Sequence, residues 1–226
     1  MPTGDTLIPD MRSALAYDEQ ARTTHWFGPE IVFGLTYEFV KPGDSLLDLG
    51  IGSGLSSVLF HKAGLRIDGL DGSTDILEVC ASKGFANELK HHDLRQLPLP
   101  YASRFYDHII SVAVLNSFQD LKALFQEISR IIKGQGIFAF TVEDQQPGQA
   151  ESYAINRVEV SEKARDETAV TLFRHRDECI AHLLDQNGFV MLKALEFLAF
   201  KYPAEHRDVF FKAYVACKTE PDQERA

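Results

Sequence analysis

The sequence predicts an α/β fold in which helices cover a doubly wound, mostly parallel β-sheet. Short apolar runs alternate with amphipathic segments between residues 45 and 142, and this alternation is typical of β-α-β units with parallel strands. A cluster of glycines directly follows the first apolar run, as at the turns that bind ligands in such folds. The length of 226 residues, with 45% of them hydrophobic, suits one globular domain with a substantial core.

Five apolar runs are predicted to form the core strands. The first is broken only by Asp48 and ends at the glycines, and the third is the weakest. The fourth and fifth are apolar almost throughout, as expected of strands buried on both faces of a parallel sheet. In order, the predicted strands are residues 45–49, 66–70, 88–91, 108–114 and 136–142.

The segments between these strands have helical periodicity. A first helix is predicted for residues 55–63, directly after the glycines. A second is predicted for residues 73–83, where Ser73 is placed to cap the helix and Gly84 to end it. Residues 121–132 carry Leu124, Phe125 and Ile128 on one face, which predicts an amphipathic helix packed on the sheet.

The pattern changes after Val142. Residues 144–168 are polar, lack a clear period and include the turn signal Pro147-Gly148, so they are interpreted as an inserted segment. A helix follows at residues 177–187, and two long strands at 189–200 and 209–217 are joined through Pro203. We therefore expect one domain over residues 1–226, divided into N-terminal lid helices (1–40), a ligand-binding core (41–142), an inserted cap (143–176) and a closing helix and hairpin (177–217).

Composition excludes several classes of protein. The formal net charge is -10 and the basic residues are scattered, whereas a protein that grips a phosphate backbone usually carries a basic stripe. No nucleic-acid partner is therefore expected. The first residues do not resemble a secretory signal, and the apolar runs are too short to span a bilayer. These features predict a cytoplasmic protein with no membrane contact.

The three cysteines are far apart and form no C-x-x-C pair. Each lies in an apolar stretch, so we expect them to pack as small hydrophobic residues rather than to bind metal. No other set of residues has the spacing of a metal site.

The most informative segment is Asp48-Leu49-Gly50-Ile51-Gly52-Ser53-Gly54. A dinucleotide-binding turn reads G-x-G-x-x-G and holds an anionic pyrophosphate at a helix N-terminus. Here Leu55 occupies the third glycine position of that pattern, and Asp48 would repel a pyrophosphate. A carboxylate at this turn instead suits a ligand with a cationic end.

A second acidic residue follows at the expected distance. Asp71 ends the second predicted strand, 23 positions after Asp48, and an acidic residue about twenty positions beyond a glycine turn can accept hydrogen bonds from ribose hydroxyls. The alternative is that Asp71 only shapes the turn into the next helix, since Gly72-Ser73 follow it.

These motifs resemble those of the class I S-adenosylmethionine-dependent methyltransferases, whose first motif is D/E-x-G-x-G-x-G. The segments 105–110 and 129–136 resemble the family's F-D-x-V/I and R-x-L-K-P-G-G motifs, with Gly134-Gln135 in place of Pro-Gly; in the first of these, Asp107 is expected to be structural. The resemblance is to the small-molecule, UbiE-like branch, and it implies a Rossmann-like sheet of seven strands, mostly parallel with an antiparallel C-terminal strand. It also implies that S-adenosyl-L-methionine is the cofactor.

The resemblance implies a set of cofactor-binding residues. Most of them follow the carboxyl ends of the first four predicted strands, with Asp93 near the adenine amino group and Leu94 beside the ring. The set comprises Tyr17, Trp26, Asp48, Gly50, Ile51, Gly52, Gly54, Leu55, Asp71, Gly72, Ser73, Ile76, Asp93, Leu94, Ala113 and Val114.

The sequence carries no catalytic motif. Methyl transfer needs mainly alignment of the acceptor, so the catalytic residues are unknown, with His25 and Asn116 as weak candidates. Tyr17 and Trp26 are equally well explained as parts of a lid or as packing residues. The tripeptide Arg174-His175-Arg176 is interpreted as a solvated loop in preference to a site for an anionic substrate.

The leading hypothesis is a methyltransferase, monomeric or homodimeric, that acts on a small-molecule acceptor. Three alternatives stay open at this point: a methyltransferase acting on protein or RNA, a non-catalytic cofactor-binding or partner-stabilising protein, and an NAD-dependent dehydrogenase. The dehydrogenase is opposed by Leu55 in the glycine turn.

Overall fold

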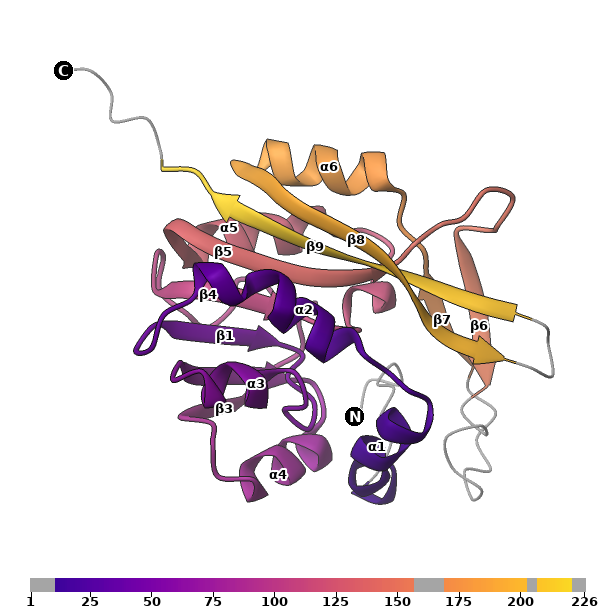
Figure 1. The fold of residues 1–226 in the computed structure, drawn as a ribbon, viewed down its shortest axis with the longest axis horizontal. Coiled ribbons are helices and arrows are strands. Elements are labelled where there is room, and N and C mark those ends of the chain that lie inside the picture. Colours follow the sequence, from indigo (N-terminus) through magenta and orange to yellow (C-terminus); the bar gives the residue numbers. More distant parts are fainter. Residues whose placement is uncertain (1–10, 157–168, 203–206, 221–226) are drawn as a thin grey trace.

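The structure, a computed structural model, describes residues 11–156, 169–202 and 207–220. Its centre is a seven-stranded sheet with the order β3-β2-β1-β4-β5-β9-β8 (Figure 1). The first five strands are parallel, whereas β9 runs antiparallel to both β5 and β8. The predicted fold class is therefore confirmed.

Three of the five predicted core strands, β1 to β3, have nearly the predicted bounds, and β5 begins earlier than expected. The strands of the sheet are β1 (Ser45–Leu49), β2 (Arg66–Asp71), β3 (Glu88–His91), β4 (Tyr106–Ser111), β5 (Ile132–Glu143), β8 (Phe189–Tyr202) and β9 (Arg207–Lys218). The junction of β8 and β9 predicted at Pro203 lies outside the described residues.

Helices cover both faces of the sheet. Neighbouring strand residues such as Leu46 and Leu47 point to opposite faces, and each belongs to a different hydrophobic cluster. One cluster includes side chains of α5 (Lys122–Ile131) and α6 (Asp177–Gln186), and the other includes those of α2 (Gly28–Thr36), α3 (Ser57–Lys62) and α4 (Thr74–Ser82). This is the doubly wound arrangement.

Two predictions about elements were wrong. The strand expected over residues 108–114 ends at Ser111, because the chain turns at Ala113, which has φ of 59°, into the short 3-10 helix η2 (Leu115–Ser117). Part of the segment expected to lack periodicity is a strand, β6 (Ser152–Asn156), which pairs with β7 (Ala169–Phe173) in a separate two-stranded sheet.

The cysteines follow the expectation only in part. Cys80 is buried in the core of α4, as expected. Cys217 is half-buried. Cys179 is exposed because it lies on the outer face of α6, whose buried residues are Ile180 and Leu184.

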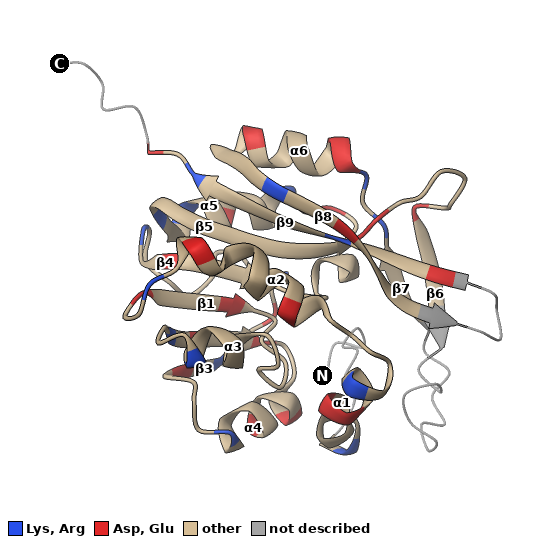
Figure 2. Cartoon of the chain, viewed as in Figure 1, with Lys and Arg blue, Asp and Glu red and all other residues tan. Residues whose placement is uncertain are grey.

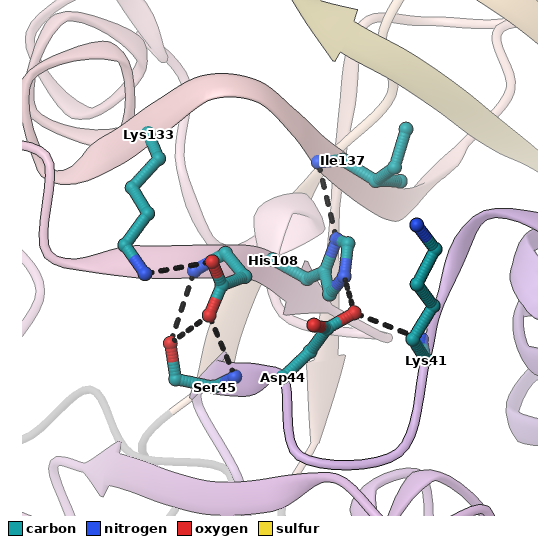
Figure 3. Close-up of polar contacts among 7 residues, drawn as sticks. Lys41, Asp44, Ser45, His108, Lys133 and Ile137 are labelled. Atoms are coloured by element: carbon teal, nitrogen blue, oxygen red, sulfur yellow. Dashed lines mark hydrogen bonds and ion pairs between the residues drawn. The ribbon is translucent and has the colours of Figure 1, made fainter.

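A polar network fixes the amino ends of the central strands (Figure 3). The Asp107 carboxylate accepts hydrogen bonds from the Ser45 backbone N–H (2.9 Å), the Ser45 hydroxyl (2.6 Å) and Lys133 Nζ (2.7 Å). Partial burial opposes ionisation of Asp107, but these donors outweigh it and lower its pKa to about 2. Beside it, buried His108 places Nε2 2.9 Å from Asp44 and accepts the Ile137 N–H at Nδ1 (3.3 Å). These contacts lock β1, β4 and β5 in register, so their carboxyl ends meet at one edge.

The N-terminal part forms α1 (Met11–Thr23), α2 and the 3-10 helix η1 (Tyr37–Phe39). In Figure 1 the arrow of β1 points toward the side of the molecule where α1 and the β6–β7 hairpin lie. None of the helices in the described ranges combines the length and apolar character needed to cross a bilayer.

Candidate functional site

The glycine turn joins β1 to α3 at the carboxyl edge of the sheet. Gly50, Gly52 and Gly54 have φ of 75°, 55° and 84°, a region that side chains with a Cβ rarely adopt. A Cβ on Gly50 would lie 2.5 Å from Val114, and one on Gly54 would lie 2.4 Å from Phe85, whereas one on Gly52 would meet nothing within 4 Å. Gly50 and Gly54 therefore serve packing, and Gly52 is the position of the turn that a ligand can approach.

Asp71 links this turn to the next one. Its Oδ2 accepts the Gly52 N–H and its Oδ1 accepts the Ser73 N–H, both at 2.9 Å. Burial raises the pKa of Asp71, while the N–H groups of Ser73, Gly52 and Gly72 act in the opposite direction. Each carboxylate oxygen has a second lone pair, so Asp71 can still accept hydrogen bonds from a ligand.

Asp48 is the second carboxylate at this edge and is only 2% exposed. Its Oδ2 accepts a hydrogen bond of 2.6 Å from the Ser57 hydroxyl in the first turn of α3. Burial raises the pKa of Asp48 to about 7; the Ser57 hydrogen bond opposes this effect and the Asp71 charge adds to it. Two carboxylates whose charges affect each other disfavour an anionic ligand at this turn and favour a cationic one.

Helix α1 brings a phenol to the same place. Burial, followed by the charges of Asp71, Asp18 and Asp48, raises the pKa of Tyr17 to about 12. The hydroxyl therefore stays protonated near neutral pH and can donate a hydrogen bond. The structure thus brings Tyr17 to the glycine turn, and its neighbour Asp18 reaches the turn directly by accepting a hydrogen bond from Ser53. In the sequence, only its place beside Tyr17 points to Asp18.

The remaining predicted residues of the core lie in the turns and helices that follow β1 to β4. Ser73 caps α4 by accepting the Ile76 N–H (3.5 Å), and Val114 packs against Gly50. Leu94 is buried, while Asp93 is half-buried and accepts the Arg95 N–H (2.9 Å). The carboxyl ends of β1 to β4 therefore contribute residues to one edge, and contact of each with a cofactor stays a prediction.

Trp26 lies in an aromatic cluster at the ends of β8 and β9. Its ring stacks on Phe200 with centroids 5.1 Å apart and meets the edge of Phe211 at 5.3 Å, and its side chain is 7% exposed. Of the two interpretations left open, these contacts favour packing. His25 is exposed and stacks on Phe27.

A buried ion pair that sequence reasoning missed lies at the carboxyl end of β5. Arg174 Nε donates to Glu143 Oε1 (2.9 Å), and the Tyr153 hydroxyl donates to Glu143 Oε2 (2.7 Å). The Arg174 guanidinium lies 4.2 Å from the centre of the Tyr153 ring. Arg174 and His175 are only 7% and 8% exposed, so the prediction of a solvated loop was wrong for both. Only Arg176 of that tripeptide is exposed.

Asn116 is buried in η2, the short 3-10 helix that follows β4 along the chain. Its Oδ1 has no hydrogen-bond partner among the described residues. His175 packs against the same segment, with Nε2 3.3 Å from the Leu115 carbonyl oxygen. Burial lowers the pKa of His175, against the hydrogen bonds to the Leu115 and Phe118 carbonyls, so the imidazole is neutral near pH 7.

Comparison with known proteins gives a family match. Residues 47–140 match the family described as a methyltransferase domain. A malonyl-[acyl-carrier protein] O-methyltransferase from Serratia marcescens is 30% identical over 131 residues, which are 58% of this chain and 49% of that protein. The chain spans half or less of the length of the curated relatives that it matches.

Solved structures share the fold at low identity. A chain in the complex of the Haloferax volcanii Trm112 methyltransferase activator with a methyltransferase has a TM-score of 0.72 and 17% identity, covering 97% of this chain and 100% of that one. Magnesium protoporphyrin IX methyltransferase from Synechocystis, solved with bound SAH, has a TM-score of 0.63 and 18% identity, covering 89% of this chain and 86% of its own.

Proposed function

We propose, for a chain that carries a class I S-adenosylmethionine-dependent methyltransferase domain, that the whole protein transfers the methyl group of this cofactor to a small-molecule acceptor. The observation that carries the proposal is the pairing of an open glycine turn with one buried and one half-buried carboxylate, Asp48 and Asp71. Gly52 faces open space, and its N–H donates a hydrogen bond to Asp71. Asp48 precedes the same turn and accepts a hydrogen bond from Ser57 after it. Among the described residues, this turn alone has these features and also lies within the segment that matches the family.

The residues at the turn fit S-adenosylmethionine. Its methionine moiety carries an ammonium group and the sulfonium, and Asp48 can supply negative charge at the turn. The free lone pairs of Asp71 suit ribose hydroxyls, because a carboxylate can accept several hydrogen bonds. A dinucleotide fits less well, since Asp48 and Asp71 would repel its pyrophosphate. An NAD-dependent dehydrogenase is therefore not favoured.

When bound, the cofactor would supply a sulfonium methyl group that an acceptor nucleophile attacks in line, with S-adenosylhomocysteine as the neutral leaving group. The protein's own residues then have two tasks, which are to hold the cofactor still and to keep water from the methyl group. Proximity and orientation alone can contribute about 7 to 11 kcal/mol in favourable cases. A general base is required only for an acceptor that is protonated at working pH, and His25 and Asn116 stay the candidates for direct contact with the acceptor.

A small molecule is the acceptor class that the surface supports best. Lys and Arg are interspersed with Asp and Glu over the elements in Figure 2, without a basic stripe along the described chain. The net charge of -10 also disfavours a nucleic acid. We propose that residues 1–40 and 143–176 cover the carboxyl edge and shape the acceptor pocket.

Calorimetry with three ligands tests the proposal. We expect S-adenosylmethionine and S-adenosylhomocysteine to bind in the micromolar range and NAD not to bind comparably. Metabolite extracts can then be assayed for formation of S-adenosylhomocysteine, which reports turnover with any acceptor. Binding of NAD without binding of either sulfur ligand would refute the proposal.

A further inference from the structure

Helix α1 is attached to the rest of the molecule through both oxygens of one carboxylate. Asp18 Oδ1 accepts a hydrogen bond from the Ser53 hydroxyl, and Asp18 Oδ2 pairs with Lys83 Nζ at 2.5 Å. Ser53 lies inside the glycine turn and is fully buried, and Lys83 is the C-cap residue of α4. Asp18 therefore joins three elements: α1, the glycine turn and α4, beside which α1 lies (Figure 1).

These contacts surround the position where a ligand can approach. Ser53 stands between Gly52, which faces open space, and Gly54, which packs on Phe85. Tyr17, the residue before Asp18, lies close enough to Asp71 and Asp48 for their charges to affect its hydroxyl. For α1 to move away from the glycine turn, both hydrogen bonds of Asp18 must break.

The geometry points to Asp18 as a positioning residue that holds α1 over the glycine turn and thereby sets the rate of cofactor exchange. This inference rests on the proposed function. Asp18 acts through Tyr17 and Ser53. The side chains of Asp18 and Lys83 are 28% and 29% exposed, so solvent screens this pair less than a fully exposed one. Hydrogen bonds that involve a charged group are also stronger than neutral ones.

The chain offers a matched control in the same helix. Glu19 carries the same charge as Asp18, but its partner is Arg22 within α1, and the two side chains are 67% and 73% exposed. Glu19→Gln therefore removes one charge from α1 without loosening the helix from α4. Asp18→Asn removes one charge and also weakens both contacts to other elements.

The experiment measures the release of radiolabelled S-adenosylhomocysteine from the full chain, chased with unlabelled ligand. Hydrogen bonds to charged groups are stronger than neutral ones, so we expect Asp18→Asn and Lys83→Met each to speed release about ten- to a hundredfold. The double variant should release no faster than the faster single one, because both remove the same contact. Glu19→Gln should stay within about twofold of the unmodified protein.

A purely structural role predicts different results. It would lower the melting temperature of Asp18→Asn without accelerating release relative to Glu19→Gln, and that outcome would overturn the inference. Hydrogen exchange of α1 without ligand separates this question from the proposed function. Faster exchange in Asp18→Asn than in Glu19→Gln supports the attachment of α1 even if no sulfur ligand binds, and equal exchange contradicts it.

Discussion

At the scale of single residues, burial and backbone conformation decide which members of the glycine turn can serve a ligand. The three glycines look equivalent in the sequence, yet two of them are required by neighbouring side chains and only Gly52 faces open space. Likewise, Asp48 and Asp71 are both carboxylates, but Asp48 is bonded to a side chain and Asp71 to backbone N–H groups. These differences yield separate tests.

Gly52→Ala should weaken binding of S-adenosylhomocysteine at least about tenfold, because the added methyl group occupies the open space and favours another backbone conformation. Gly43→Ala is a matched control. Gly43 also has positive φ, 93°, and open space around its missing Cβ, but it lies in the loop before β1. Both variants should lose similar stability in urea unfolding, and calorimetry should detect weaker binding only for Gly52→Ala. Equal affinities would place the ligand elsewhere.

Asp48→Asn should stabilise the ligand-free protein increasingly as pH rises. Burial raises the pKa of Asp48 from 3.8 to about 7, so the folded protein holds its proton more tightly than the unfolded chain does. The stability associated with this proton is complete below about pH 4 and is lost as pH rises through about 7. One pKa unit corresponds to about 1.4 kcal/mol, and Asn can still accept the Ser57 hydrogen bond.

Urea unfolding at pH 5 and pH 8 measures this effect. The gain of Asp48→Asn over the unmodified protein should be larger at pH 8 by roughly one to a few kcal/mol. Asp107→Asn provides the opposite case, because its partners lower the pKa of Asp107 to about 2. The stability from Asp107 is present above about pH 4 and is lost as pH falls toward 2. A pH-independent gain for Asp48→Asn would show that this carboxyl ionises normally.

At the scale of elements, local patterns predicted the strands and helices of the core and failed where tertiary contacts decide. The helices α4 and α5 have clear periodicity and, for α4, a capping residue that the structure uses. The end of β4 was misplaced because residues 112–114 are apolar like a strand, although the turn at Ala113 is held by Thr141 Oγ1 from a distant strand. The hairpin β6–β7 was missed because β6 lies in the mostly polar segment 144–168 and is formed by its pairing with β7, which follows that segment.

The candidate site was predictable to a similar extent. The glycine turn, Asp48 and Asp71 could be found because their roles depend on short spacings within the chain. Asp18, Glu143 and Arg174 could not, since the oppositely charged partner of each lies 31 or more positions away and a charged residue in a polar segment is usually exposed. Only the fold brings these charges together.

Arg174→Met should destabilise the protein by about 3–5 kcal/mol, because it leaves the buried Glu143 carboxylate without its cation. Arg176→Met is the matched control, since Arg176 is exposed and its Nε donates only to Gln145. Urea unfolding should show little change for the control. The double variant Glu143→Leu with Arg174→Met should recover part of the loss, and equal destabilisation of all three variants would contradict a specific ion pair.

At the scale of the whole molecule, the two ends of the parallel strands are held in different ways. The amino ends of the strands are fixed by the network of Asp107 and His108, whereas the carboxyl edge faces α1 and the β6–β7 hairpin (Figure 1). Helix α1 contacts mainly α4, and the hairpin is attached through Glu143 and Arg174. Elements with few attachments open most easily.

Cofactor should therefore protect α1 and the β6–β7 hairpin from hydrogen exchange, because a reactive methyl group must meet its acceptor away from water. The change should be largest in Met11–Thr23, which carries Tyr17 and Asp18, and in Ala169–Phe173. Helix α5 is the internal control, since it packs in the core on one face of the sheet and should exchange equally with and without ligand. Trp26 fluorescence gives a second measurement, and its change should be small because the ring is packed among Phe197, Phe200 and Phe211. If exchange in both covering segments is unaltered while calorimetry shows the cofactor bound, the cover comes from elsewhere, for example from a partner chain.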